Sequence, residues 1–203
     1  MAHLEEHDIE SLKTQFKLDT FFETGTGNCE GIIHAKECGF NNIHTVDCME
    51  QTTTAAKSKC PWAKVHLGKS SSVISAFQTM RKVEPPCRVL WWLDAHFPGV
   101  DTGILNWQES RESHAAREFM PLADELDAIV SDLWENDVIL IDDAFLYRAG
   151  ILDIPANDRV PDWATSGLGS LESRMDRLLS THTLTIKSEG TGSFVLTPKE
   201  QPL

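Results

Sequence analysis

Hydrophobic and polar positions follow two periods along the chain, and the periods alternate between those typical of strands and helices. Short apolar runs predict five strands, over Lys17–Glu23, Asn42–Asp47, Ala63–Leu67, Arg88–Leu93 and Val138–Ile141. Apolar residues at helical spacing predict helices in the intervening segments, over Ile9–Phe16, Gly31–Gly39, Glu50–Lys59, from Ser70–Ser72 to Arg81, and over Pro121–Asn136. Arg88–Leu93 is apolar after its first residue, as expected of a central parallel strand covered on both faces.

The C-terminal part of the pattern differs. Leu171–Leu179 is helical in spacing, and two strands, Thr183–Lys187 and Ser193–Thr197, flank Gly190 and Gly192. This spacing predicts an antiparallel hairpin. Because strand and helix alternate five times before the hairpin, the sequence predicts an α/β fold, a Rossmann-like, doubly wound and mostly parallel sheet. No internal repeat or linker divides the chain, so we expect one domain over residues 1–203.

Two stretches do not fit the alternation. They cover residues 97–120 and 144–169, and each follows the carboxyl end of an apolar strand. Open α/β sheets bind their ligands at that edge, and long segments without regular structure are often functional. We therefore expect these two insertions to form the substrate side, with serines 70–72 capping the helix that precedes the central strand.

Composition narrows the possible partners. The chain has 203 residues, with 31 acidic and 18 basic side chains and a formal net charge of −13. This balance disfavours nucleic acid and anionic membranes, since both are bound through clustered Lys and Arg. It leaves neutral or cationic substrates and carboxylate sites for metal ions. Five cysteines without a CxxC pair, no signal peptide in Met1–Phe16 and no membrane-length apolar run predict a cytoplasmic protein.

The first predicted strand runs into a glycine-rich loop, Glu23-Thr24-Gly25-Thr26-Gly27, followed by Asn28-Cys29-Glu30-Gly31. Glycines let the backbone approach a ligand and expose the next helix N-terminus. A dinucleotide fingerprint would have Gly or Ala where this chain has Glu30, a side chain that suits a zwitterion or a cation better than a pyrophosphate. By itself, the loop is also compatible with a simple structural turn.

Asp47 ends the second strand, 20 positions after Gly27. An acidic residue at this place accepts hydrogen bonds from ribose hydroxyls in nucleotide-binding folds. The alternative is a solvated carboxylate at a strand end. Together, the glycine loop and Asp47 favour a nucleoside-containing cofactor whose charge is not dominated by phosphates.

Three further carboxylates follow two apolar strands. Asp94 follows Arg88–Leu93, while Asp142 and Asp143 follow Val138–Ile141. On adjacent parallel strands they would meet at one edge, where mutual repulsion favours a bound cation, Mg²⁺ or else Mn²⁺ or Ca²⁺. Helix capping is the structural alternative. His96 lies two residues beyond Asp94 and is a candidate general base, a metal ligand or a packed loop histidine.

These motifs, with VHLGKSS and PLADEL, resemble class I S-adenosylmethionine (SAM)-dependent methyltransferases in order and spacing, most closely the metal-dependent macrocin and novobiocin-type O-methyltransferases. The resemblance implies a seven-stranded sheet, Mg²⁺ at Asp94, Asp142 and Asp143, and His96 with Asp94 in catalysis. It also implies SAM-binding residues, namely Glu23, Thr24, Gly25, Thr26, Gly27, Asp47, Cys48, Lys69, Ser70 and Asp94. Lys69 departs from the family, which commonly has an acidic residue there against adenine.

The implied reaction is metal-assisted O-methylation of a small hydroxylated substrate. Two alternatives stay open. LDAH, which includes Asp94 and His96, also resembles the ligand motif of metal-dependent ureohydrolases, and a protein of the same fold could bind SAM without transferring its methyl group. We expect neither nucleic acid nor membrane as a partner, and the aromatic insertion with Trp107 and Phe119 could serve a homodimer.

Overall fold

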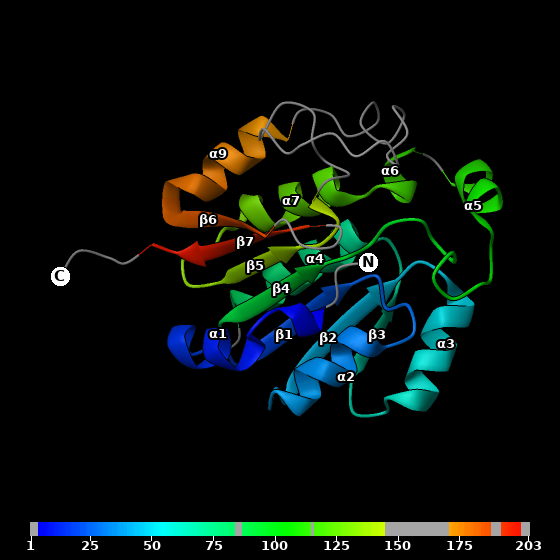
Figure 1. Cartoon of the computed structure of the whole chain (residues 1–203), viewed down its shortest axis with the longest axis horizontal. Coiled ribbons are helices and arrows are strands. Elements are labelled where there is room, and N and C mark those ends of the chain that lie inside the picture. Colours follow the sequence, from blue (N-terminus) through cyan, green and yellow to red (C-terminus); the bar gives the residue numbers. More distant parts are fainter. Residues whose placement is uncertain (1–3, 84–86, 115, 145–170, 188–191, 200–203) are drawn as a thin grey trace.

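The computed structural model describes residues 4–83, 87–114, 116–144, 171–187 and 192–199. Its centre is a seven-stranded sheet in the order β3-β2-β1-β4-β5-β7-β6 (Figure 1). The strands are β1 (Thr20–Thr24), β2 (Asn42–Asp47), β3 (Lys64–Leu67), β4 (Val89–Leu93), β5 (Val138–Ile141), β6 (His182–Lys187) and β7 (Ser193–Pro198). β1 to β5 pair in parallel, and β7 pairs antiparallel with both β5 and β6. The predicted fold class is confirmed.

Helices connect these strands. They are η1 (Leu4–Glu6), α1 (Ile9–Phe16), α2 (Glu30–Glu37), α3 (Glu50–Lys59), α4 (Ser70–Arg81), α5 (Trp107–Ser113), α6 (Ala116–Phe119), α7 (Leu122–Ser131) and α9 (Glu172–Thr181). The predictions for β2, α3 and β5 match to the residue, and the predicted end of α4 at Arg81 is also correct, because each has a clear period and sharp flanking polar or turn residues. None of the described helices combines the length and the apolar character needed to cross a membrane.

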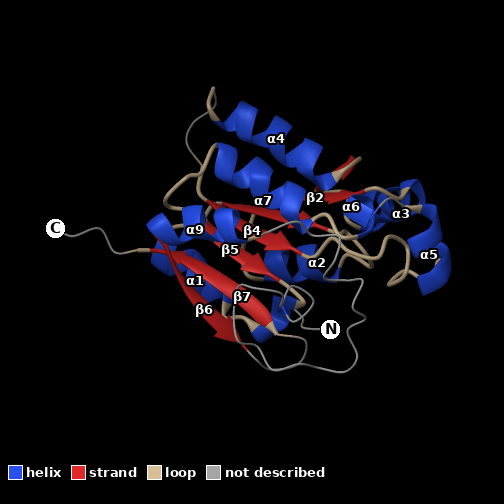
Figure 2. Cartoon of the chain, turned by 90° about the horizontal axis from the view of Figure 1, so that it is seen from above, coloured by secondary structure: helices blue, strands red, loops and turns tan. Residues whose placement is uncertain are grey.

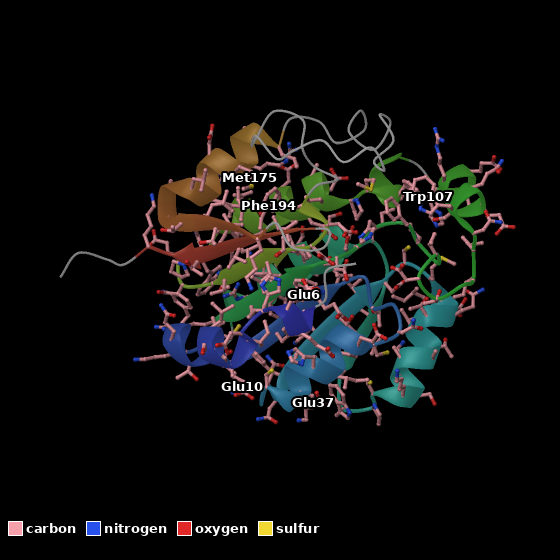
Figure 3. All side chains as sticks on the ribbon, in the orientation of Figure 1. Glu6, Glu10, Glu37, Trp107, Met175 and Phe194 are labelled. Carbon is pink, nitrogen blue, oxygen red and sulfur yellow. The ribbon has the colours of Figure 1, made fainter. Side chains whose placement is uncertain are left out.

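Two hydrophobic layers enclose the sheet, and neighbouring residues of one strand serve opposite layers. Phe22 and Trp91 pack with α4, α7 and α9, whereas Phe21 and Trp92 pack with α1 and α2. Figure 2 shows these helices on the two sides of the sheet. In Figure 3, Met175 of α9 and Phe194 of β7 lie in the same part of the molecule, and both belong to the hydrophobic layer formed with α4, α7 and α9. Strand alternation thus places a double-sided core beneath the carboxyl edge.

The insertions give a mixed outcome. We expected residues 97–120 to lack regular structure. They instead contain α5 and α6. Asn106 begins α5 with a capping box, because its side chain accepts from the Glu109 backbone while Glu109 accepts from the Asn106 backbone. Phe97, Trp107 and Phe119 then form an aromatic cluster with ring centroids 4.9–5.6 Å apart. The second insertion, 144–169, lies outside the described residues after Ala144.

One capping prediction is wrong. The N-cap of α4 is Lys69, not one of the serines, and no side chain caps the helix. Ser70 is buried and is the first helical residue. Its hydroxyl is therefore available for contacts outside the helix.

Candidate active site

The predicted site residues lie along the carboxyl edge of the sheet, where β1, β2, β4 and β5 end. Register brings them together: Thr24 of β1 is opposite Leu93, and Leu93 is opposite Ile141. The amide of Asp94 then donates to Thr24 O at 3.2 Å, and the amide of Asp142 donates to Leu93 O at 3.0 Å. The two aspartates therefore follow adjacent strands side by side, as the topology predicts.

The glycine loop approaches the end of β4 very closely. Gly25 has φ +81°, and a Cβ there would lie 2.6 Å from the carbonyl oxygen of Asp94. At Gly31, a Cβ would collide with the carboxylate of Glu23. Gly27, with φ +46°, has open space where a Cβ would lie. The first and third glycines therefore serve packing, while the second faces a void that a ligand can enter.

Glu23 is buried beneath the loop and held by threonines. Thr45 Oγ1 donates to Glu23 Oε2 at 2.6 Å, and Thr26 Oγ1 lies 2.8 Å from Thr45 Oγ1. Burial raises the pKa of Glu23 to about 8, with Asp47 adding repulsion. Such a carboxyl releases its proton readily when a positive charge arrives beside it. Sequence reasoning missed Thr45, because its role depends on the pairing of β1 with β2.

Asp47 lies at the end of β2, next to the glycine loop. Its Oδ1 accepts from the amide of Met49 at 2.8 Å. Burial raises the pKa of Asp47, although amides of the loop stabilise the charged form. Cys48, the next residue, is exposed as a whole, and burial of its thiol raises the thiol pKa to about 11. Asp47 is thus a fixed acceptor, and Cys48 is an unreactive neighbour.

His96 ties the aspartates together. Its Nε2 lies 2.8 Å from Asp143 Oδ2, and its Nδ1 lies 3.5 Å from Asp94 Oδ1. Burial by itself lowers the pKa of His96, but the hydrogen bond to Asp143 and the charges of both aspartates raise it to about 10. Burial and repulsion within the cluster also raise the pKa of Asp94 and bring that of Asp142 to about 7.

Backbone strain is concentrated at this edge. Of the four described non-glycine residues with positive φ, three belong to the site, namely Cys29 (69°), Phe97 (47°) and Asp143 (48°). The expectation that Asp143 lies beyond its strand is confirmed, since β5 ends at Ile141. The left-handed backbone of Asp143 accompanies its contact with His96. Such conformations cost about 1–3 kcal/mol each and persist where the surroundings enforce them.

Lys69 is joined to the first insertion. Its Nζ lies 2.5 Å from Glu118 Oε1, so an acidic group from α6 neighbours the position at which the resembling family has one of its own. Ser70, next to it, contacts a residue that sequence reasoning missed. Glu125 of α7 is buried, and burial raises its pKa to about 7, while the nearby hydroxyls of Ser70 and Thr24 stabilise its charged form. The sequence contained one signal for this residue, because Glu125 is an acidic residue on the apolar side of the helix that begins with PLADEL.

Two cavities open at the edge and share Gly25, Asp47, His96 and Pro98. The acidic cavity, about 420 Å³, is lined by carboxylates from several elements, namely Glu5, Glu23, Glu30, Asp47, Asp94, Asp101 and Asp142. The neighbouring cavity, about 530 Å³, is lined by residues that include Cys48, Lys69, Ser70, Glu118 and Asp124. Asp47 therefore stands at the junction of two spaces, together large enough for a drug-sized ligand.

The carboxylates at this edge are suitable ligands for a cation, but their side chains are not arranged to coordinate one. Asp142 Oδ1 is buried without a hydrogen-bond partner in the described part of the chain, which suits a bound cation. Asp143 and Asp94, however, both contact His96. Within the described ranges, no three His, Cys, Asp or Glu side chains are arranged to hold a metal ion.

Comparisons with known proteins agree on the fold. Neither a family model nor a curated protein matches the sequence. Solved structures do match. An SAH-bound methyltransferase from Podospora anserina has a TM-score of 0.57 at 15% identity, covering 95% of this chain and 76% of that one. An O-methyltransferase from Bacillus cereus in complex with SAH gives 0.57 at 12% identity, with 98% and 82% covered.

A third structure is an O-methyltransferase from Streptomyces achromogenes in complex with SAM, with a TM-score of 0.57, 13% identity, and 95% and 78% covered. The chain therefore has the fold of SAM-dependent methyltransferases, and the resemblance seen in the motifs is confirmed at the level of the fold. This fold is the framework within which the carboxyl-edge residues must be interpreted.

Proposed function

We propose that this protein is a SAM-dependent methyltransferase that methylates a hydroxyl oxygen of a small molecule. One observation carries the proposal: Gly25 and Asp47 line both cavities at once. A cofactor whose ribose is bound by Asp47 would place its adenine in the neighbouring cavity and its methionine part in the acidic cavity, against Glu23 and Asp94. Several solved neighbours of this fold are SAH or SAM complexes, which supports the choice of cofactor.

The adenosine part of the cofactor would bind in the neighbouring cavity. Cys48, Lys69 and Ser70 line it beside Asp47, and Glu118 engages the ammonium of Lys69. Buried Glu125 lies near the hydroxyls of both Ser70 and Thr24. Thr24 Oγ1 also accepts from the Asp94 amide at 3.2 Å, so Glu125 would lie between the two ends of the proposed cofactor site.

The residues fit a hard divalent ion by donor type. Asp94, Asp142 and Asp143 would hold it through carboxylate oxygens, the donor type that such ions prefer. Bound there, Mg²⁺ or a similar ion would supply a Lewis acid that lowers the pKa of a substrate hydroxyl. Binding would require His96 to give up one of its carboxylate contacts, and this exchange can be tested.

His96 is the proposed base. Bound SAM would supply an electrophilic methyl group and leave as a neutral thioether, and His96 would accept the proton of the attacking hydroxyl at Nε2 or Nδ1. With a pKa of about 10 inside the carboxylate cluster, the imidazole holds a proton at neutral pH. Positive charge beside Asp94 and Asp143 lowers that pKa, so the neutral imidazole belongs to the ligand-bound site.

Calorimetry with SAM tests the cofactor assignment, and transfer of a labelled methyl group to hydroxylated acceptors tests the reaction. We expect binding that Asp47→Asn weakens about tenfold, and transfer that chelation or Asp94→Asn reduces at least a hundredfold. Asp176→Asn, an exposed change on α9, is the matched control. SAM binding without transfer to any acceptor would favour an inactive binding protein, and transfer unaffected by chelation would remove the metal.

A further inference from the structure

The acidic cavity holds more negative charge than the proposed cofactor offsets. Seven carboxyl groups line it, and none of its described lining residues is Lys or Arg. The neighbouring cavity differs, since Lys69 stands there against Glu118. SAM brings one sulfonium, one ammonium and one carboxylate, a single net positive charge. The proposed cofactor and metal sites use Glu23, Asp47, Asp94 and Asp142. Three carboxyl groups, Glu5, Glu30 and Asp101, therefore remain for another ligand.

Three of these carboxylates form an exposed rim. Glu5 comes from η1, Glu30 from the start of α2, and Asp101 from the loop after β4. The Asp101 carbonyl accepts from Asn28 Nδ2 at 3.3 Å, which joins this loop to the glycine loop. The acidic rim, Glu5, Glu30 and Asp101, thus comes from three separate segments around one opening.

Glu30 gives the rim its selectivity against anions. It is the first residue of α2, where the helix dipole and free amides stabilise a negative charge. Helix N-termini after glycine loops commonly bind anionic ligands. Here the protein's own carboxylate stands at that position, so an anionic ligand would meet repulsion instead of attraction.

Asp142 supplies a second, independent observation inside the same cavity. Its residue is only 3% exposed, and its Oδ1 has no hydrogen-bond partner among the residues that the structure describes. A buried carboxylate oxygen without a partner is unfavourable. Since Asp142 lines the cavity, a ligand with positive charge or N–H donors would satisfy it.

We propose that the methyl acceptor carries a positively charged group, an ammonium or a guanidinium, bound in the acidic cavity between the acidic rim and Asp142. Its reacting hydroxyl would face Asp94 and His96. This inference rests on the proposed function, because it names the acceptor class of the same site. Carboxylate- and phosphate-bearing acceptors are disfavoured by the same charges, which also attract cations from a distance.

Two matched sets of acceptors test the charge and keep the reacting group constant. The catechol set is dopamine, 4-ethylcatechol and 3,4-dihydroxyphenylacetate, and the sugar set is glucosamine, glucose and glucuronate. Labelled methyl transfer from SAM and calorimetric binding in the presence of SAH are measured for each, with Mg²⁺ present. We expect the cationic acceptor to bind and to be methylated at least tenfold better than the neutral acceptor in one set or both. The anionic acceptor should rank last in each set.

Rim variants test where the discrimination arises. Glu30→Gln and Asp101→Asn should each lower the preference for the cation over the neutral acceptor about threefold to fivefold, the size of one partly screened charge interaction. Glu37→Gln is the control, because Glu37 is exposed on the same helix at its opposite end (Figure 3). Added salt should reduce the preference in the parent protein and less in the rim variants.

The outcomes separate this inference from the proposed function. Equal or better binding and transfer with neutral acceptors would overturn the inference. It would also be overturned if none of the six compounds bound while SAM still did. A cation preference that Glu30→Gln and Asp101→Asn leave unchanged would also overturn it. Absence of SAM binding, with dopamine or glucosamine still bound through the rim, would instead overturn the proposed function.

Discussion

His96 Nε2 lies 2.8 Å from Asp143 Oδ2, so one imidazole joins the end of β4 to the turn that follows β5. The contact connects two residues that are far apart in the sequence, and Asp143 has a left-handed backbone conformation. Three carboxylates would otherwise repel one another at this edge. His96 is therefore the internal positive charge of the cluster as well as its candidate base.

Replacing His96 separates these roles. In His96→Gln, methyl transfer should fall about 10²–10⁴-fold, the usual contribution of a positioned base, while SAM affinity stays within about threefold. Single-turnover transfer and calorimetry give the two numbers. Turnover that persists at neutral pH would remove the base assignment, and a parallel loss of SAM binding would show that His96 acts through the shape of the cavity.

The glycine loop offers a pair of matched substitutions. Gly25→Ala should abolish measurable SAM binding, because its Cβ would meet the Asp94 carbonyl at 2.6 Å and its φ is +81°. Gly27→Ala should weaken binding less than Gly25→Ala does. Its φ is also positive, but open space surrounds the added carbon. Calorimetry at equal folded fractions checks the order, and the reverse order would contradict the proposed path of the loop.

A buried ion pair between the end of α4 and the residue before β5 leads to a prediction about stability. Arg81 Nη1 and Nη2 donate to Asp137 at 2.7 and 2.8 Å, and both side chains are 1% exposed. Asp137 also accepts from the Trp91 indole at 2.9 Å. Arg81→Met should lower the free energy of unfolding by about 3–5 kcal/mol, because it leaves a buried carboxylate without its charge partner.

Lys82 provides the control for that measurement. It is the next residue, and its exposed ion pair with Asp132 at 2.6 Å has side chains 51% and 31% exposed. Lys82→Met should change the free energy of unfolding by at most about 1 kcal/mol. Urea unfolding of both variants gives the comparison, and similar losses would contradict the distinction between buried and exposed pairs.

His44 makes stability depend on pH. Burial, with help from Lys64 and His66, lowers its pKa to about 3, so the folded protein keeps the imidazole neutral. The unfolded chain takes up this proton near pH 6.5. The contribution is therefore complete above about pH 6.5 and is lost as pH falls towards 3.

Unfolding free energies of the parent and His44→Phe check this linkage. Between pH 7 and pH 5, the parent should lose about 1–2 kcal/mol more than the variant does. Phe is a suitable replacement, since His44 stacks on Phe22 with ring planes 13° apart. Parallel pH profiles for the two proteins would show that His44 titrates normally in the fold.

The sequence by itself determined the elements and the edge. β2, α3 and β5 were predicted to the residue because their period and their flanking residues are local signals. Parallel order then placed Asp47, Asp94 and Asp142 at one edge, since every parallel strand of such a sheet ends on the same side. α5 was missed although Asn106 and Glu109 carry a capping-box signature, because its short apolar pattern is weak.

Only the tertiary structure decided the contacts across that edge. The Glu118 side chain beside Lys69, the burial of Glu125 near Ser70 and the bond from His96 to Asp143 join segments far apart in the chain. Side-chain distances between such segments depend on strand register, on helix packing and on φ at single residues such as Asp143. Periodicity reports which side of an element is apolar, but it contains no information about which polar groups of different elements finally meet.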